Sequence, residues 1–137
     1  MAAIVHGTAA WFEMVGQRMA CAAAQAALPA DLTVSFLETY VDGEVGPDGL
    51  RQGIRFDIVR GQPSWRVGAR PGERADIQVE ITTGAARRLN RLRAADPAFA
   101  AEQDRVLGSG EMKVEGDLAR LGGWLASVHD DIVDRTL

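Results

Sequence analysis

The sequence predicts an α+β fold in which helices pack on one face of a five-stranded, mainly antiparallel sheet. Five short segments alternate apolar and polar residues, as strands with one buried and one solvated face do. Short turns rich in glycine and proline join the first three of these segments, which favours antiparallel neighbours. The intervening segments carry apolar residues at the three- and four-residue spacing of helices.

The first helix is expected over residues 8–28, because Thr8 can cap its amino end and Pro29 stops it. One face of this helix carries bulky apolar residues at helical spacing, namely Trp11, Phe12, Val15 and Met19. We expect this face to pack on the sheet. Its aromatic residues are also candidates for one wall of a ligand cavity.

Four strands are expected next, over residues 32–41, 52–60, 65–70 and 76–82. Their β-branched and aromatic content supports this interpretation. A short helix should follow, with Leu89 and Leu92 on its inner side. Asp96 and Pro97 then indicate the start of another helix, as N-cap and first helical residue, and that helix should run to Gly108.

The stretch from Gly110 to Leu121 links a fifth strand directly to the last helix. Met112 and Val114 alternate with charged residues, and Asp117 is a suitable N-cap. The helix is expected to continue from there with one apolar stripe, made of Leu118, Leu121, Leu125, Val128 and Ile132. Gly122 and Gly123 would lie inside it, which predicts close packing or a hinge.

Length and composition limit the classes of function. The 137 residues are expected to form one domain, 1–137, made of the first helix and a body over residues 32–137. The net charge of −4 argues against nucleic-acid binding. A single cysteine, Cys21, excludes an intramolecular disulfide and a cysteine-based zinc site. The alanine-rich start lacks a basic n-region, so we interpret it as a structural helix of a cytoplasmic protein.

Three segments resemble the sterol-carrier-protein-like domain family. They are G-E-M-K-V-E-G-D-L from Gly110, A-D-I-Q-V-E-I-T from Ala75 and F-D-I-V-R-G-Q-P-S-W from Phe56. The resemblance covers roughly residues 32–124 and consists of strands, turns and glycines. It implies a lipid-binding protein with an apolar tunnel. Residues 93–107 form a longer link than is usual in that family.

Catalytic patterns are absent from the sequence. His6 and His129 are isolated, and the carboxylates Glu38, Asp57 and Glu80 fall on mixed or polar faces. There is no nucleophile elbow and no phosphate-binding glycine loop. His129, Asp130 and Asp131 are adjacent on a helix and cannot converge on a metal. We therefore predict no enzyme activity, no catalytic residue, no cofactor and no metal, and we interpret His129 as solvated helix surface.

The expected function is non-catalytic binding, and transfer, of a hydrophobic ligand such as a lipid, fatty acyl chain or sterol. The expected binding residues come from several elements: Trp11, Phe12, Val15, Met19, Leu89, Leu92, Phe99, Leu107, Met112, Val114, Leu121, Trp124 and Leu125. Hydrophobicity alone does not distinguish a lined pocket from a filled core.

Two other hypotheses remain at this point. The first is an α+β cup enzyme with an apolar substrate, which needs an acid or base pointing into the pocket. The second is an interaction module, or a homodimer, that docks through the face carrying Trp124. The arginines at positions 87, 88, 91 and 93 are expected on a solvated helix face; alternatively, they provide weak contact with an anionic membrane surface.

Overall fold

The structure is a computed structural model and describes residues 3–137. Its elements, in chain order, are α1 (Ala9–Gln25), β1 (Val34–Tyr40), β2 (Arg51–Val59), β3 (Gln62–Ala69), β4 (Ile77–Ile81), α2 (Thr83–Leu89), α3 (Pro97–Ser109), β5 (Met112–Glu115), a short 3-10 helix η1 (Leu118–Leu121) and α4 (Trp124–Asp134). Five strands and the helices between them follow the predicted order. The α+β fold class is therefore confirmed.

The five strands form one sheet in the spatial order β3-β2-β1-β4-β5. Every neighbouring pair is antiparallel except β1 and β4, which are parallel. The parallel pair arises because the chain leaves β3 at one edge and crosses the sheet to place β4 on the other side of β1. β1 is thus the central strand, and its side chains lie at the middle of the sheet.

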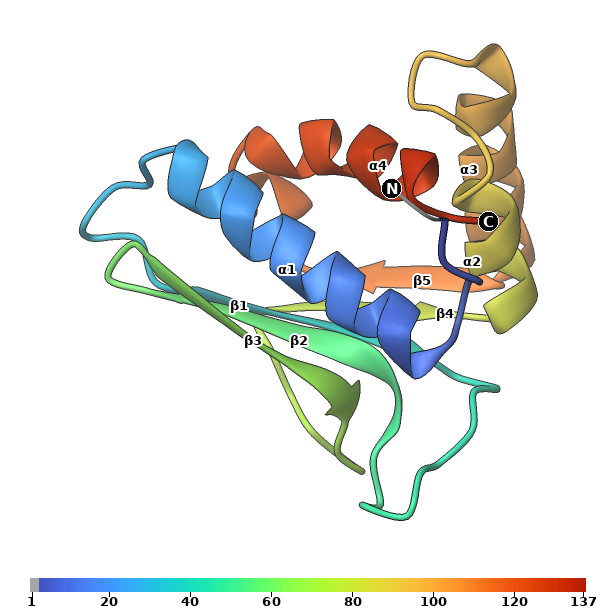
Figure 1. Ribbon diagram of the computed structural model, residues 1–137, viewed down its shortest axis with the longest axis horizontal. Helices are drawn as coiled ribbons and strands as arrows, with labels where there is room; N and C mark the ends of the chain where they lie inside the picture. The colour runs from blue at the N-terminus through green and yellow to red at the C-terminus, as the bar shows by residue number, and fades with distance from the viewer. Residues whose placement is uncertain (1–2) are drawn as a thin grey trace.

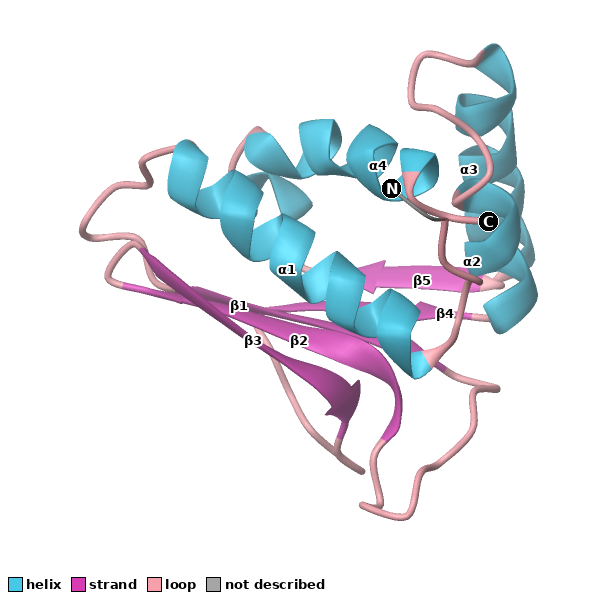
Figure 2. Cartoon of the chain, in the orientation of Figure 1, coloured by secondary structure: helices cyan, strands magenta, loops and turns pink. Residues whose placement is uncertain are grey.

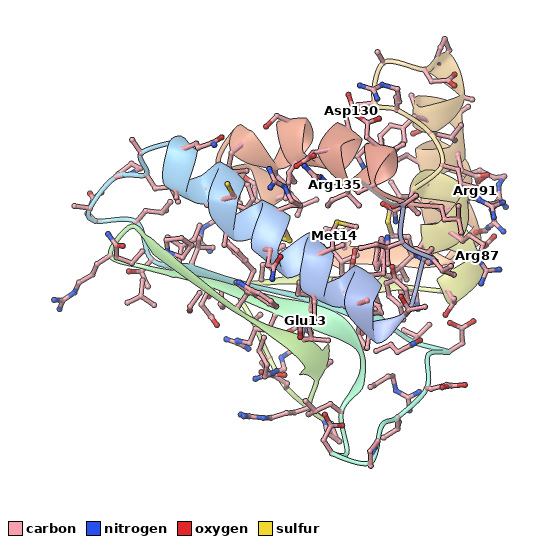
Figure 3. All side chains as sticks on the ribbon, viewed as in Figure 1. Glu13, Met14, Arg87, Arg91, Asp130 and Arg135 are labelled. Carbon is pink, nitrogen blue, oxygen red and sulfur yellow. The ribbon has the colours of Figure 1, made fainter. Side chains whose placement is uncertain are left out.

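Helices α1 and α4 lie side by side over one face of the sheet, while α2 and α3 stand at the end near β4 and β5 (Figure 1). Figure 2 shows the same division into a strand layer and a helix layer. The side chain of Met14 is buried and lies between α1 and α4 (Figure 3). The contact between α1 and β3 is so close that a Cβ at Gly16 would lie 2.2 Å from the Trp65 ring.

The core lies between the sheet and α1 and α4. Its largest fully buried side chains come from alternate positions of the strands and from η1, and they include Tyr40, Ile54, Phe56, Ile58, Ile77 and Leu121. Alternation follows from the pleat, which points successive side chains to opposite faces of a strand. The buried faces of β2 and β4 are therefore made of alternate residues, Ile54, Phe56 and Ile58 on β2 and Ile77, Val79 and Ile81 on β4.

Local capping signals agree with the helix starts. The side chains of Thr8, Thr82, Asp96 and Asp117 each accept a hydrogen bond from a backbone N–H of the following turn. Such a bond satisfies one of the backbone donors that a helix leaves unpaired at its start. Helix α1 ends at Gln25, three residues before the predicted end.

The last helix differs from the prediction. The segment after Asp117 forms only the 3-10 helix η1, and α4 begins separately at Trp124. Gly122 interrupts the two with φ +113°, a conformation that side-chain-bearing residues rarely adopt. The glycine pair therefore separates two helices, whereas the sequence predicted one continuous helix with glycines inside it.

The two ends of the described chain meet beside α1. The backbone N–H of Ile4 donates to the carbonyl of Arg135 at 2.8 Å, and that of Leu137 donates to the carbonyl of Ile4 at 2.8 Å. The indole Nε1 of Trp11 also donates to Thr136 Oγ1 at 2.9 Å. These bonds fasten the end of α4 to the start of α1.

The face of the sheet opposite the helices is polar. Arg55 pairs with Asp57 and with Glu73, and Arg66 also pairs with Glu73. Glu80 is exposed on the same side. The predicted polar positions of Asp57 and Glu80 are therefore confirmed.

Candidate ligand-binding cavity

A cavity of about 500 Å³ lies between the covered face of the sheet and the helices. Its floor includes Phe36, Ile54 and Val79 of the three central strands, with Met112 and Val114 of β5 at one side. Its walls include residues of all four α-helices, such as Trp11, Met19, Leu89, Phe99 and Leu125. The lining is predominantly apolar, and its size falls within the usual range of small-molecule pockets.

Eight of the thirteen predicted binding residues line this cavity: Trp11, Val15, Met19, Leu89, Phe99, Met112, Val114 and Leu125. They come from α1, α2, α3, β5 and α4, which tertiary folding brings together. Val114 lies opposite Val79 in the β4–β5 register, on the covered side, but it is 36% exposed because β5 is an edge strand. Whether these side chains contact a ligand stays a prediction.

Three of the other predicted residues, Phe12, Leu121 and Trp124, are buried in the core and do not line the cavity. The ring of Trp124 packs 5.4 Å from that of Phe56, and its Nε1 donates to the carbonyl of Leu121 at 2.7 Å. Phe12 and Trp124 pack against other aromatic rings, and all three residues are part of the core. A docking surface built on Trp124 has no support, since that side chain is only 6% exposed.

Leu92 and Leu107 also lie outside the cavity lining. Leu107 is 47% exposed on α3, because that helix turns Val106 towards the core instead. Leu92 is half-buried just after α2, and its carbonyl accepts a hydrogen bond from His129. The inward position predicted for Leu107 is therefore wrong.

Polar side chains also line the cavity, and the sequence did not indicate them as site residues. They are Glu38, Asn90, Gln103 and His129. Glu38 was predicted on a mixed or polar face, yet it shares the covered face with Phe36 and Tyr40 of β1. The two-residue alternation from Val34 through Phe36 places position 38 on that face, and this was the available signal.

Glu38 lies between buried apolar neighbours. In the sheet register it is opposite Ile54 on β2 and Val79 on β4. Glu38 itself is half-buried and lines the cavity. Burial raises the pKa of Glu38 to about 7, because an apolar surrounding disfavours the charged form. The charge of Glu38 in turn helps to raise the pKa of Tyr40, whose main cause is its own burial.

His129 is half-buried and lines the cavity, so its predicted place on a solvated surface is wrong. Its Nε2 lies 2.8 Å from the carbonyl of Leu92, to which it donates a hydrogen bond. Its ring packs 4.5 Å from that of Phe99. His129 is therefore held by packing and by one backbone bond at the wall formed by α4.

His6 is buried in the segment that precedes α1, and its ring packs against that of the cavity residue Trp11. Its Nε2 is hydrogen-bonded to the Tyr40 hydroxyl at 3.0 Å, while its Nδ1 has no partner among residues 3–137. Burial, with smaller contributions from Arg87 and Arg91, lowers the pKa of His6 to about 4. His6 is thus neutral at physiological pH.

The four arginines at positions 87, 88, 91 and 93 divide into two pairs, one with ion pairs within residues 3–137 and one without. Arg88 forms ion pairs with Glu102 and Glu111, and Arg93 forms ion pairs with Asp130 and Asp134. Arg87 and Arg91 lie on the outer side of α2 and its end (Figure 3). Neither of them has an ion pair within the described chain. Exposed positions for Arg87 and Arg91 agree with a solvated face.

Within residues 3–137, no group of three His, Cys, Asp or Glu side chains is arranged to hold a metal ion. None of the helices in this part of the chain has the length and hydrophobicity needed to cross a bilayer.

Comparisons with known proteins agree with the architecture. No family model matches the sequence, and no curated protein matches it. The crystal structure of sterol carrier protein 2 is similar over 96% of this chain and 99% of its own, with 14% identity and a TM-score of 0.50. The fold is that of sterol carrier protein 2. The resemblance that the sequence motifs indicated is thus confirmed at the level of the fold.

Two other solved structures show weaker likeness. Sterol carrier protein 2 from Yarrowia lipolytica, in its apo form, is 15% identical over 98% of this chain and 99% of its own, with a TM-score of 0.45. A mutant sec-alkylsulfatase is 21% identical over 68% of this chain, with a TM-score of 0.39. This chain spans 12% of that alkylsulfatase.

Proposed function

We propose that the protein binds a hydrophobic ligand, without catalysis, in the cavity between the sheet and the helices. The observation that carries this proposal is the cavity itself, about 500 Å³ of space with apolar lining contributed by all four α-helices and the sheet. Small-molecule sites are typically concave and lined mostly by hydrophobic side chains, as this pocket is. The lining therefore suits an apolar guest.

A lipid or fatty acyl chain is the ligand class that this lining suits best. Removing its apolar surface from water would supply the binding energy, at about 25 cal/mol per Å² buried. Met19 and Met112 supply flexible, polarisable surface, which adapts to chains of different shape. The likeness in fold to sterol carrier protein 2 supports the same class of ligand.

The first test is native mass spectrometry of the purified protein, which should show an additional mass that is lost on denaturation. The second is displacement of N-phenyl-1-naphthylamine, a neutral probe that fluoresces in apolar surroundings. Ala126 lines the cavity from an exposed position on α4, so Ala126→Trp should occupy part of the space. We expect it to weaken probe binding about tenfold or more, the effect of losing a good part of the apolar contact.

Ala101→Trp is the matched control, because Ala101 is exposed on α3 and lies outside the cavity lining. It should bind the probe as the unaltered protein does. Equal binding by both tryptophan variants, with unchanged melting, would place the ligand elsewhere and contradict the proposal.

A second candidate function rests on Glu38. A carboxyl group with a pKa near 7 inside an apolar cavity is the kind of group that acid–base catalysis uses. An enzyme would convert a ligand held by the protein, and Glu38→Gln would stop the conversion. Incubation of the protein with a co-purified ligand, followed by mass analysis of that ligand, separates the two functions, since a carrier returns it unchanged.

A further inference from the structure

Glu38 is placed at the bottom of the cavity by the central strand of the sheet. Its neighbours in the register, Ile54 and Val79, are 1% and 5% exposed. The adjacent residues on the same face of β1, Phe36 and Tyr40, are also buried. The carboxyl group is therefore surrounded by apolar side chains on the sheet and faces the cavity above it.

No side chain or backbone group within residues 3–137 forms a hydrogen bond or ion pair with the Glu38 side chain. Glu38 is half-buried and lines the cavity, so its unpaired carboxyl group is available to a bound ligand. Opposite the strand, α1 presents Trp11, Val15 and Met19, which contribute no cation. Asn90 and Gln103 are uncharged, and His129 is the only other titratable residue of the lining within the described chain.

The unused hydrogen-bonding capacity of Glu38 has a consequence for the ligand. A polar group that donates to this carboxyl would form a charge-assisted hydrogen bond in a site of low dielectric, where such bonds are strong. A ligand carboxylate would instead bring a second negative charge into the same apolar space. Two carboxylates sharing a site disfavour one another's ionisation and therefore oppose binding.

Building on the proposed binding function, we propose that Glu38 determines specificity by selecting amphiphiles whose polar end donates a hydrogen bond. Long-chain amines should bind best, alcohols less well and carboxylates worst. The polar end of the ligand would enter the cavity towards β1, and its hydrocarbon chain would lie against the helices.

The test compares dodecylamine, dodecanol and dodecanoate as competitors of N-phenyl-1-naphthylamine at pH 8, below their aggregation concentrations. The unaltered protein should bind dodecylamine at least about tenfold more tightly than dodecanoate, the ratio expected for one charge-assisted hydrogen bond. Glu38→Gln keeps the shape and removes the charge, so it should reduce this ratio to about threefold or less. Melting temperatures confirm that each variant folds.

Glu80→Gln is the matched control. It changes the net charge by the same amount on the neighbouring strand β4, but Glu80 is exposed on the opposite face of the sheet. It should leave the preference for the amine unchanged. A general attraction of the amine to an acidic protein would instead be reduced equally by both variants, and that result would overturn the proposal.

Glu38→Leu provides a second variant with a different readout. If the ligand's hydrocarbon chain rather than its polar end contacts position 38, Glu38→Leu will increase the affinity for all three ligands equally. That result would show that the proposal is wrong. If Glu38→Leu lowers the affinity for the amine and raises the affinity for the carboxylate, the proposal holds. Failure of the probe and of all three ligands to bind the unaltered protein would overturn the proposed binding function together with this inference. A changed preference order alone overturns only the inference.

Discussion

A glutamate on each side of the sheet has a shifted pKa, and the two shifts have opposite directions. On the polar face, Glu73 accepts from Arg55 at 3.0 Å, from Arg66 and from the backbone N–H of Arg70. These partners outweigh the opposing effect of its burial and hold the pKa of Glu73 below its usual value. On the covered face, Glu38 has no partner in the described chain, and burial raises its pKa to about 7.

This contrast separates a structural carboxylate from a functional candidate. Glu73 fixes the loop between β3 and β4 against the strands by satisfying two arginines at once. Glu38 stabilises nothing that the structure describes, and its burial as an anion costs free energy. A half-buried carboxyl group that lines a cavity and has no structural partner in the described chain is a candidate for ligand recognition.

The largest effect is expected for Glu38→Gln. The raised pKa means that the unfolded state loses its proton first, so folding stability declines as the pH rises from 4.5 through about 7. At pH 8 the variant should be more stable than the unaltered protein by up to about 3 kcal/mol, and the difference should vanish below pH 4.5. Urea unfolding at several pH values measures this. A difference that does not depend on pH would contradict the burial of the ionised group.

Glu73→Gln should lower the folding stability, by less than Glu38→Gln raises it. The lowered pKa of Glu73 means that its contribution to stability is present above its unfolded pKa of about 4.5 and is lost at lower pH. We expect a loss of about 2 kcal/mol at pH 7, because hydrogen bonds to a charged group are removed and Arg66 loses its carboxylate partner, whereas Arg55 keeps Asp57. The loss should shrink as the pH falls below 4.5. Equal stability of the two proteins at pH 7 would show that the hydrogen bonds and ion pairs of Glu73 do not stabilise the fold.

His6→Gln tests the buried base on the covered face. Because its pKa in the folded state is about 4, the unfolded state binds a proton first, and stability declines as the pH falls from 6.5 towards 4. The unaltered protein should lose about 1 kcal/mol between pH 7.5 and pH 5.5 from this source. His6→Gln should remove that loss while it keeps a polar group near the Tyr40 hydroxyl. If stability depends on pH in the same way in both proteins, the lowered pKa of His6 is not the cause of this loss.

The smallest effect is expected for Arg87→Gln combined with Arg91→Gln. Both positive charges help to lower the pKa of His6, so their removal should raise it by a few tenths of a unit at low salt. Proton NMR of the imidazole measures this shift, and stability should hardly change. Arg70→Gln, an exposed site in the loop after β3, is the control and should leave the pKa of His6 unaltered. A shift of equal size in the control would indicate a change in overall charge only.

Local sequence signals sufficed to predict the elements. Thr8, Asp96 and Asp117 act through hydrogen bonds to residues two or three positions away, so neighbouring sequence contains all the information that these caps need. The alternation around Met112 and Val114 likewise depends only on the geometry of a single strand. The fold class and most strand faces followed from such signals.

The site was predicted less completely, because a cavity depends on residues far apart in the chain. The pattern did not separate Trp11 and Met19, which line the cavity, from Phe12 and Trp124, which fill the core beside it. All four are apolar, and the burial of each is favourable in either place. The difference lies in which neighbours reach them, and that is a property of the assembled helices.

The amino-acid sequence by itself determined where most helices and strands lie and which face of most strands is apolar, since hydrogen bonds and side-chain periodicity act within a few residues. Tertiary structure alone decided that β4 pairs with β1 and that the last helix restarts after Gly122. It also decided that Glu38 meets a cavity with no partner in the described chain. The physical reason is that packing and solvent exclusion are set by distant segments, which no local pattern records.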